Sequence, residues 1–580
     1  MPTNDNCRLT FFKWGIVLVF LAAYPSPPGW TAQKFFPFDK IEKGLRGHGL
    51  TVFEGTRVEE FPVEVIGILP NIAPRRNLFL VRLQGEKAAR WGVASGMSGS
   101  PIYLDGSLAG ALSYTWNFSK EPVAAVTPIH EMLDLLGEFP ERKAASLPPA
   151  STESQIKLLF RPERLVDYFN RYLERTRPLS LPGGFPLGNL AIPIAFSGIE
   201  PAAIPGLPEQ FERSGFLPLP ASTGPISRIL TPPAGAVPAG GTNELQPGSA
   251  VAVKLIRGDV EVSAVGTVTH VDGDQVLAFG HPFLNLGSTD LPMALAEVQT
   301  LLSSYSSSFK FATPLQDVGS IHQDRMAGLA GRIGQEPAML PVRLEIELPG
   351  DRTQEYRFEV VETPYLSPYL MYIALNGILS SAWKEFGEAT VEIQEGSTFL
   401  LAGNRENVTL RNLFAGPTSP YTASATIAFI YHVLIGNEFE PVKVSGINLR
   451  LRYVEEPRIA RIDRIWCDRD TVRAGETVSL SVAMRPYREP GVTRSLEIQI
   501  PEETRPGKLL LQVGDGLSMS RREHSAPEMV PRDLDQLILL INHLRTNDKV
   551  YVLLTREEGE TVIRGERFSH LPLSRASVLL

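Results

Sequence analysis

Cysteine is almost absent from this chain of 580 residues, which contains only Cys7 and Cys467. Cys7 precedes an apolar run of signal-peptide type and would be removed with it, so Cys467 would remain alone and no internal disulfide framework is expected. The nine histidines are scattered, and no cysteine pair is present to complete a structural zinc site with them. The sequence therefore predicts neither a metal nor a cofactor.

Blocks of basic residues are also missing. The formal net charge is −8, and no cluster of lysine and arginine offers the concentrated positive surface that phosphate backbones require. A nucleic-acid partner is therefore excluded. Hydrophobic residues make up 43% of the chain and charged residues 21%, which is ordinary for a globular protein. At this length we expect about three or four domains.

Long hydrophobic runs are absent after the N-terminal region, where no segment has the roughly 20 apolar residues of a membrane-spanning helix. Arg8 and Lys13 precede an apolar run at 14–24, which has the length of a signal-peptide core, and three prolines follow at positions 25 to 28. Residues 1–32 are predicted to be a signal peptide or an N-terminal anchor. The protein would then be exported, as a periplasmic, secreted or membrane-tethered protein. A buried N-terminal helix is the alternative.

Most of the remaining sequence has β texture. Short β-branched and aromatic stretches separated by Gly, Pro and Asn occupy residues 50–83, and the same texture resumes after Pro247. Near the C-terminus, apolar residues alternate with polar ones over 478–484 and 496–500, which predicts a half-buried antiparallel sheet in a small sandwich. We divide the chain after residue 32 into segments 33–140, 141–245, 246–335, 336–455 and 456–580.

A few helices interrupt this texture. Apolar residues at helical spacing predict amphipathic helices over 162–173 and 534–544, the first with proline in its first turn. The stretch "LPMALAEVQTLL" at 291–302 also suggests a helix, with Asp290 as its cap. Residues 231–243, "TPPAGAVPAGGTN", are typical of an exposed linker.

The stretch "GMSGSPIYLDGSLAGALSY" at 96–114 is the candidate for a catalytic serine motif. A nucleophilic serine needs a tight turn with backbone N–H groups nearby for an oxyanion, and glycines on either side of Met97-Ser98 allow such a turn. The residues that follow read as two strands joined at Asp105-Gly106, so a hairpin would brace the turn. A tight turn without catalytic function is the alternative reading.

This stretch, together with "GTVTHVDGDQVLAFGHPF" at 266–283, resembles the SpoIVB-type serine peptidases, which are exported bacterial enzymes of chymotrypsin-like character. The resemblance implies a mainly β fold with a chymotrypsin-like double β-barrel built from segments 33–140 and 246–335, and it does not cover the sandwich-like domain expected at the C-terminus. It assigns Ser98 as the nucleophile and His281 as the general base. Backbone N–H groups of Gly96 and Ser98 would form the oxyanion hole, and the substrate would be a protein or peptide.

Two features depart from the family. The histidine motif follows the serine motif instead of preceding it, although catalytic geometry does not depend on chain order. Gln84 stands at or beside the position where the family has an aspartate, and an amide cannot stabilise an imidazolium as a carboxylate does. Asp290 is the first candidate for the missing acid, with Asp272 and Asp274 behind it.

Three functions remain open on this basis. The first is an exported serine endopeptidase working through an acyl-enzyme. The second is an inactive protein of peptidase fold that binds peptides or envelope proteins, as the glutamine at position 84 suggests. The third, a carbohydrate- or surface-binding sandwich protein, rests on the C-terminal region alone.

Overall fold

The structure is a computed structural model that describes residues 34–116, 119–137, 151–171, 188–199, 204, 206–220, 244–381, 388–403, 405–523, 531–556, 561–563 and 566–568. The chain divides into two compact units at Lys34, and all but the first of the described residues belong to the second unit. The predicted N-terminal segment 1–32 and linker 231–243 lie outside the described residues. Within those ranges no helix is both long and apolar enough to cross a membrane.

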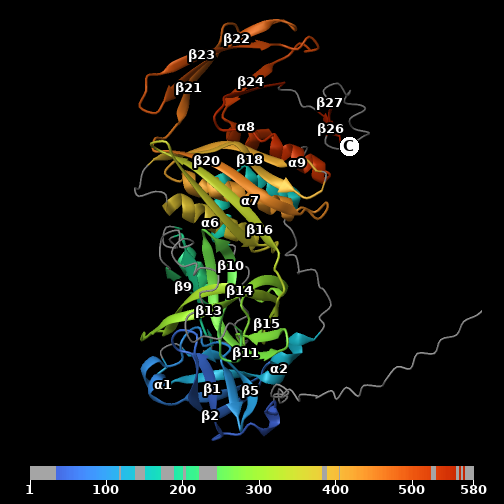
Figure 1. Ribbon diagram of the computed structural model, residues 1–580. Coiled ribbons are helices and arrows are strands. Elements are labelled where there is room, and N and C mark those ends of the chain that lie inside the picture. The colour runs from blue at the N-terminus through green and yellow to red at the C-terminus, as the bar shows by residue number, and fades with distance from the viewer. Residues whose placement is uncertain are drawn as a thin grey trace, which may run out of the picture. The chain divides into compact units, whose positions relative to one another are not determined.

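The prediction of a mainly β protein is confirmed, and its first large feature is a closed barrel of six antiparallel strands (Figure 1). These strands are β1 (Arg46–Val52), β2 (Val58–Ala73), β3 (Arg76–Leu83), β4 (Pro101–Leu104), β5 (Ser107–Thr115) and β6 (Val123–Pro128). They pair in the order β4-β1-β2-β3-β6-β5, and β4 also pairs with β5, so the sheet returns to its first strand. Closure leaves no open edge in the ring. The short helices beside it are η1 (Phe38–Lys40), α1 (Glu86–Trp91), α2 (Ile129–Leu133) and η2 (Asp134–Leu136).

A second ring of strand pairings is formed by residues 250–333. Its members are β10 (Ala250–Gly258), β11 (Glu261–Asp272), β12 (Gln275–Ala278), β13 (Gly287–Leu302), β14 (Phe309–Arg325) and β15 (Gly328–Ile333). They pair antiparallel in the order β10-β13-β14-β15-β12-β11, and β11 pairs back to β10. One apolar cluster contains residues of both rings, with Val63 and Ile102 from the first and Ala252 and Val298 from the second. The two segments are therefore in contact through a shared core.

The prediction of a helix over 291–302 is wrong, because these residues lie in the long strand β13. Leu, Met, Ala, Glu and Gln favour helices in isolation, but here the segment pairs with β10 on one side and β14 on the other. The intrinsic helix propensities of such residues differ by only about 0–0.7 kcal/mol per residue, so hydrogen bonding to two neighbouring strands outweighs them.

The connecting segment 141–245 is described in part. It contributes α3 (Thr152–Leu159), α4 (Pro162–Asn170), β7 (Gly188–Asn189), β8 (Ile192–Ser197), α5 (Leu207–Arg213) and β9 (Phe216–Pro220). The predicted helix starting at Pro162 is confirmed as α4, with Leu165 and Phe169 completely buried. Strand β8 pairs with β11, so this segment extends the second ring's sheet.

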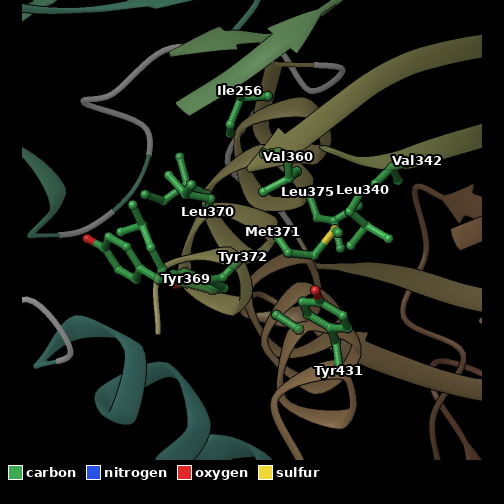
Figure 2. Packing of buried hydrophobic residues seen from close by; sticks show 14 of the residues in the cluster. Ile256, Leu340, Val342, Val360, Tyr369, Leu370, Met371, Tyr372, Leu375 and Tyr431 are labelled. Atoms are coloured by element: carbon green, nitrogen blue, oxygen red, sulfur yellow. The ribbon is translucent and has the colours of Figure 1, made fainter. Parts of the chain in front are cut away.

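Segment 336–455 extends the same sheet on its other side and adds two helices that the sequence reading missed. Its elements are β16 (Met339–Leu348), β17 (Arg352–Val361), α6 (Ser367–Ser381), β18 (Ala389–Leu401), β19 (Val408–Gly416), α7 (Ser419–Ile435) and β20 (Val444–Val454). Helix α6 is buried on every side over Ser367–Leu379, so it has no polar face and no amphipathic period to detect. Figure 2 shows Met371 and Leu375 of α6 beside Leu340 of β16 and Val360 of β17 in the large core.

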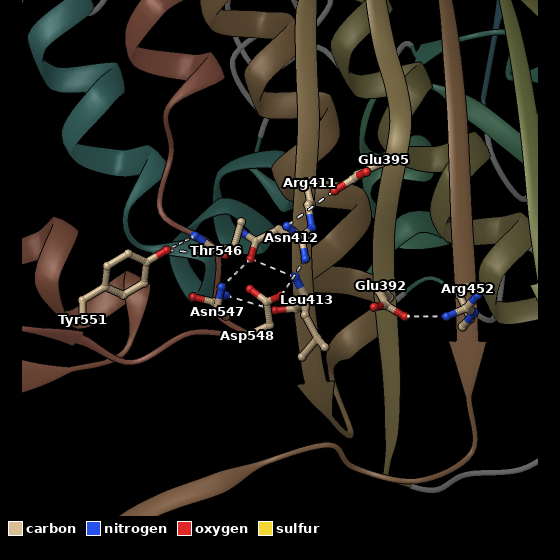
Figure 3. A network of polar contacts seen from close by, with 10 residues as sticks. All are labelled: Glu392, Glu395, Arg411, Asn412, Leu413, Arg452, Thr546, Asn547, Asp548 and Tyr551. Atoms are coloured by element: carbon tan, nitrogen blue, oxygen red, sulfur yellow. Dashed lines mark hydrogen bonds and ion pairs between the residues drawn. The ribbon is translucent and has the colours of Figure 1, made fainter. Parts of the chain in front are cut away.

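The C-terminal segment contains small sheets. Its elements are β21 (Ala460–Cys467), β22 (Thr477–Pro486), β23 (Val492–Gln499), β24 (Leu509–Gly514), α8 (Gly516–Glu523), α9 (Leu534–Asn542), β25 (Tyr551–Arg556), β26 (Thr561–Ile563) and β27 (Glu566–Phe568). The predicted antiparallel pairing of β22 with β23 and the helix over 534–544 are confirmed, while the sandwich stays a prediction. Asn547 donates its N–H to Asn412 Oδ1 (2.9 Å) and Asp548 pairs with Arg411 (3.0 Å), so this segment contacts β19 (Figure 3).

Candidate active site

Ser98 lies on a tight turn between α1 and β4. Gly96 and Gly99 have φ values of 91° and 93°, the left-handed region that favours glycine. A Cβ added to Gly99 would lie 2.0 Å from the carbonyl oxygen of Thr267 and 2.4 Å from the nitrogen of Phe279. The turn is thus pressed against the backbone of the second ring, and only glycine fits at position 99.

Hydrogen bonds fix this turn to both rings. Gly99 donates its N–H to Leu112 O (2.7 Å) in the predicted hairpin, which is confirmed as β4 and β5. The N–H of Thr267 donates to Ser98 O (2.8 Å), and the Thr267 hydroxyl donates to Gly96 O (2.9 Å). The carbonyl groups of Gly96 and Ser98 are therefore held by β11.

The N–H groups of the turn fall into two sets. Those of Ser95, Met97 and Gly99 each donate to a backbone carbonyl. Those of Gly96 and Ser98 have no acceptor among the described residues. These two groups are the ones predicted to form the oxyanion hole, and both residues are buried.

His281 follows two residues in left-handed conformation, Phe279 and Gly280, both with φ of 68°. Such a backbone is costly for phenylalanine, and strain of this kind often accompanies functional sites. A Cβ at Gly280 would lie 3.0 Å from Ala111 Cβ and 3.1 Å from Leu112 O, so the first ring's hairpin packs directly on this segment. Thr127 adds a hydrogen bond from its hydroxyl to Gly280 O (2.7 Å).

The hydrogen bonding of His281 fixes its tautomer. Its Nδ1 lies 2.9 Å from the carbonyl oxygen of Pro282, and a carbonyl only accepts, so Nδ1 carries the proton. In the neutral ring Nε2 then has a free lone pair, which is the form a general base needs. Complete burial lowers the pKa of His281 to about 4, so the ring is neutral at pH 7.

No hydrogen bond joins Ser98 to His281 in the described residues, but the segments that carry them are in contact. Gly99, which follows Ser98, packs on Phe279, and Gly280, which precedes His281, packs on Leu112, whose carbonyl accepts the Gly99 N–H. Both side chains are completely buried, and neither Ser98 Oγ nor His281 Nε2 has a partner in the part of the chain that the structure describes. Buried polar atoms without a partner are uncommon in proteins, and Ser100 Oγ in the same turn is another.

The candidate acids do not bind the imidazole. Asp290 Oδ2 accepts the N–H of Ala338 (2.7 Å), and Asp274 pairs with Arg332 (3.4 Å) in the turn that also contains Asp272. Gln84 donates to Glu64 (2.9 Å). Within the described residues, the only hydrogen-bond partner of His281 is the Pro282 carbonyl.

A different acid, which the sequence reading missed, supports the histidine loop. Asp324 accepts the N–H groups of Phe283 (2.8 Å), Leu284 (2.8 Å) and Leu286 (3.0 Å), directly after His281-Pro282. Burial raises the pKa of Asp324 to about 6, against the effect of these donors. Because Asp324 binds backbone N–H groups, which every residue except proline has, no sequence motif predicts these contacts.

Lys310 was also missed. It lies beside the Ser98 turn, with its side chain completely buried and Nζ 2.7 Å from Thr51 Oγ1 and 3.2 Å from Thr267 Oγ1. In the sequence "FKFA", the phenylalanines would be expected to face the core, but the structure buries Lys310 and Ala312 and leaves the two phenylalanines partly exposed.

Comparisons with protein-family models, with curated proteins and with solved structures found no match to this chain. The assignment of the site therefore rests on its residues and geometry.

The buried imidazole makes stability depend on pH. Below its ordinary pKa of 6.5, the unfolded chain binds a proton at His281 that the folded protein, with a pKa of about 4, does not bind. We expect this residue to lower the free energy of unfolding by up to about 3 kcal/mol as the pH falls from 6.5 to 4. Urea denaturation across this range measures the effect.

The control for this prediction is His281→Gln, which does not titrate. Asp324 acts with the opposite sign, because its raised pKa makes the folded state bind more protons between pH 4 and 6, but it is present in both proteins. The difference between wild type and variant therefore isolates His281. Parallel pH curves for the two proteins would show that the imidazole is not held neutral by the fold.

Proposed function

We propose that this chain is an exported serine endopeptidase of SpoIVB type that cleaves peptide bonds through an acyl-enzyme. Ser98 is the nucleophile, His281 the general base, and the two rings of strands form a chymotrypsin-like pair of barrels assembled in permuted order. The observation that carries the proposal is the pair of free N–H groups at Gly96 and Ser98, flanking the serine turn. The substrate is a protein or peptide.

The reaction follows from the positions of these groups. Ser98 Oγ attacks the carbonyl carbon of the scissile bond while His281 Nε2 takes its proton, and the two N–H groups bind the resulting oxyanion. The imidazolium then gives the proton to the leaving amine. Water attacks the acyl-enzyme with His281 again as base, which releases the second product and restores the serine.

The carbonyl of Pro282 takes the orienting position in this scheme. It accepts the Nδ1 proton and so selects the tautomer with a free Nε2, as the triad aspartate does in serine peptidases. A neutral carbonyl stabilises the imidazolium less than a carboxylate, so catalysis is expected to be slow. Asp290 binds the Ala338 N–H through Oδ2 and has no partner at Oδ1 in the described structure, and Asp290→Ala tests whether it supplies the missing charge.

Complete burial of Ser98 and His281 means that the site must open before a substrate binds. The same burial, with the missing Ser98–His281 hydrogen bond, favours the second candidate function, an inactive protein of peptidase fold that binds peptides or envelope proteins. A fluorophosphonate separates the two, because only an activated serine displaces its fluoride.

We expect a fluorophosphonate to label the purified full-length protein at Ser98. The serine oxygen forms the bond to phosphorus, fluoride leaves, and His281 takes the proton. Mass spectrometry of the digested protein locates the adduct, and Ser100, which is equally buried and equally unpaired, is the internal control. Absence of any adduct after prolonged incubation of the folded protein would favour the inactive binding protein.

A further inference from the structure

Lys310 is a buried lysine without an acidic partner. In the described residues, no carboxylate pairs with Nζ, whose only hydrogen-bond partners are the hydroxyl groups of Thr51 on β1 and Thr267 on β11. An ammonium ion in a dry interior costs several kcal/mol unless it is paired, so a fold rarely keeps one without function. Burial alone lowers the pKa of Lys310 to about 7, so that the residue changes charge near neutrality.

The lysine is linked to the serine turn in three ways. Its backbone N–H donates to Ser95 O (2.9 Å). Its aliphatic chain packs where a Cβ at Gly96 would lie, with Lys310 Cβ and Cδ both 3.2 Å away. Its Nζ binds the hydroxyl of Thr267, the residue that holds the carbonyl groups of both Gly96 and Ser98.

The direction of these hydrogen bonds shows what Lys310 does for Thr267. The Thr267 hydroxyl has one proton, which it donates to Gly96 O (2.9 Å). Its oxygen therefore accepts from Nζ, and a positive Nζ strengthens the donation to Gly96, since linked hydrogen bonds polarise one another.

We propose that Lys310 is a positioning residue for the Ser98 turn, acting through Thr267 to hold the turn in the form that binds an oxyanion. This inference rests on the proposed peptidase function and deepens it. Lys310 is not assigned contact with the substrate. Its protonated form is the active one.

The pH profile of serine labelling is the direct test. In wild type we expect the second-order rate of fluorophosphonate labelling to fall as the pH rises through about 7, where Lys310 loses its proton. His281, with a pKa of about 4, contributes only an acid limb well below this range. The groups facing Nζ from β1 and β11 are hydroxyls that do not titrate here. Asp324, with a pKa of about 6, supports the His281 loop and is also present in Lys310→Met, so the part of the upper limb that this variant removes belongs to Lys310.

Three variants locate the effect. Lys310→Met keeps the length of the side chain. We expect its labelling at pH 6 to be about tenfold slower than that of wild type, a smaller loss of rate than the 10²–10³-fold caused by removing an oxyanion-hole donor. The fall in rate near pH 7 should be absent from this variant. Its melting temperature should be equal to or above that of wild type, because an unpaired buried charge is removed. Thr267→Val should slow labelling similarly by cutting the link to the turn.

Thr51→Val is the matched control. It removes the shorter of the two hydrogen bonds to Nζ but leaves the link through Thr267. We expect the rate at pH 6 to stay within about twofold of wild type, with the upper limb moved to lower pH because the ammonium has lost an acceptor. Equal effects of Thr51→Val and Thr267→Val would overturn the proposed path.

A second readout does not require an active serine. Hydrogen exchange of the peptide containing residues 94–100 should be faster in Lys310→Met and Thr267→Val than in wild type and Thr51→Val. If wild type is not labelled but these exchange differences appear, the peptidase proposal fails and the positioning of the turn stands. Unchanged exchange and unchanged labelling in Lys310→Met would overturn the inference, as would a wild-type rate that rises through pH 7, which would make Lys310 the base.

Discussion

Ser98→Ala, His281→Ala and the double variant are each expected to lose nearly the same peptidase activity, about a thousandfold or more in kcat/KM. Nucleophile and base act on one proton, so removing either disables the same step and the separate losses do not add. The measurement is hydrolysis of quenched fluorescent peptides by the full-length protein.

Ser100→Ala is the matched control for this set, because Ser100 is also completely buried and its Oγ also has no hydrogen-bond partner in the described structure. It lies beyond the turn, and we expect its activity to stay within a few-fold of wild type. Additive losses from Ser98→Ala and His281→Ala would mean that the two residues do not work as a pair. Activity that survives Ser98→Ala would remove the serine from the mechanism.

The parts of this site that the sequence predicted are those specified by local chemistry. Gly96 and Gly99 predict a turn because few other residues accept a positive φ, and Asp105-Gly106 predicts a hairpin for the same reason. The contact between the two segments was predicted only by the resemblance of their motifs. No pattern within either segment indicates that Gly280 packs on Leu112.

The missed elements depend on tertiary structure. β13 consists of helix-favouring residues that become a strand between two partners, and α6 is buried on every side, so neither shows the expected period. Lys310 lies at a core position where alternation would predict an apolar residue. Asp324 acts on backbone N–H groups, a role open to any acid at a suitable place in the fold.

The sequence reading proposed Ser98 and His281 as the groups that would carry out the chemistry, but it did not find the groups that hold them in place. Support for the histidine comes from a carbonyl and from Asp324, and support for the serine turn comes from Thr267 and Lys310. Gln84, the departure that motivated the search for another acid, binds Glu64, and no hydrogen bond joins it to His281 in the described structure.

Gly99→Ala is expected to have the largest effect on stability of any single change at this site. The added Cβ would lie 2.0 Å from Thr267 O and 2.4 Å from Phe279 N, and both are backbone atoms of the second ring that cannot turn aside as a side chain would. The left-handed conformation of residue 99 adds about 1–2 kcal/mol for a non-glycine residue. We expect the turn to separate from β11, with a total loss above about 3 kcal/mol.

Gly106→Ala separates the two causes. Gly106 also has a positive φ, 72°, but a Cβ there has no atom within 4 Å, so this variant bears only the conformational cost of about 1–2 kcal/mol. Thermal and urea unfolding of the two variants, monitored by the same probe, gives the cost of the contact as their difference. Because the shared core joins the rings as well, Gly99→Ala is expected to loosen the serine turn before it unfolds either ring, and proteolysis within residues 94–100 should report this first. Equal destabilisation by the two variants would mean that Gly99 is required only for the turn and that the second ring does not press on the serine.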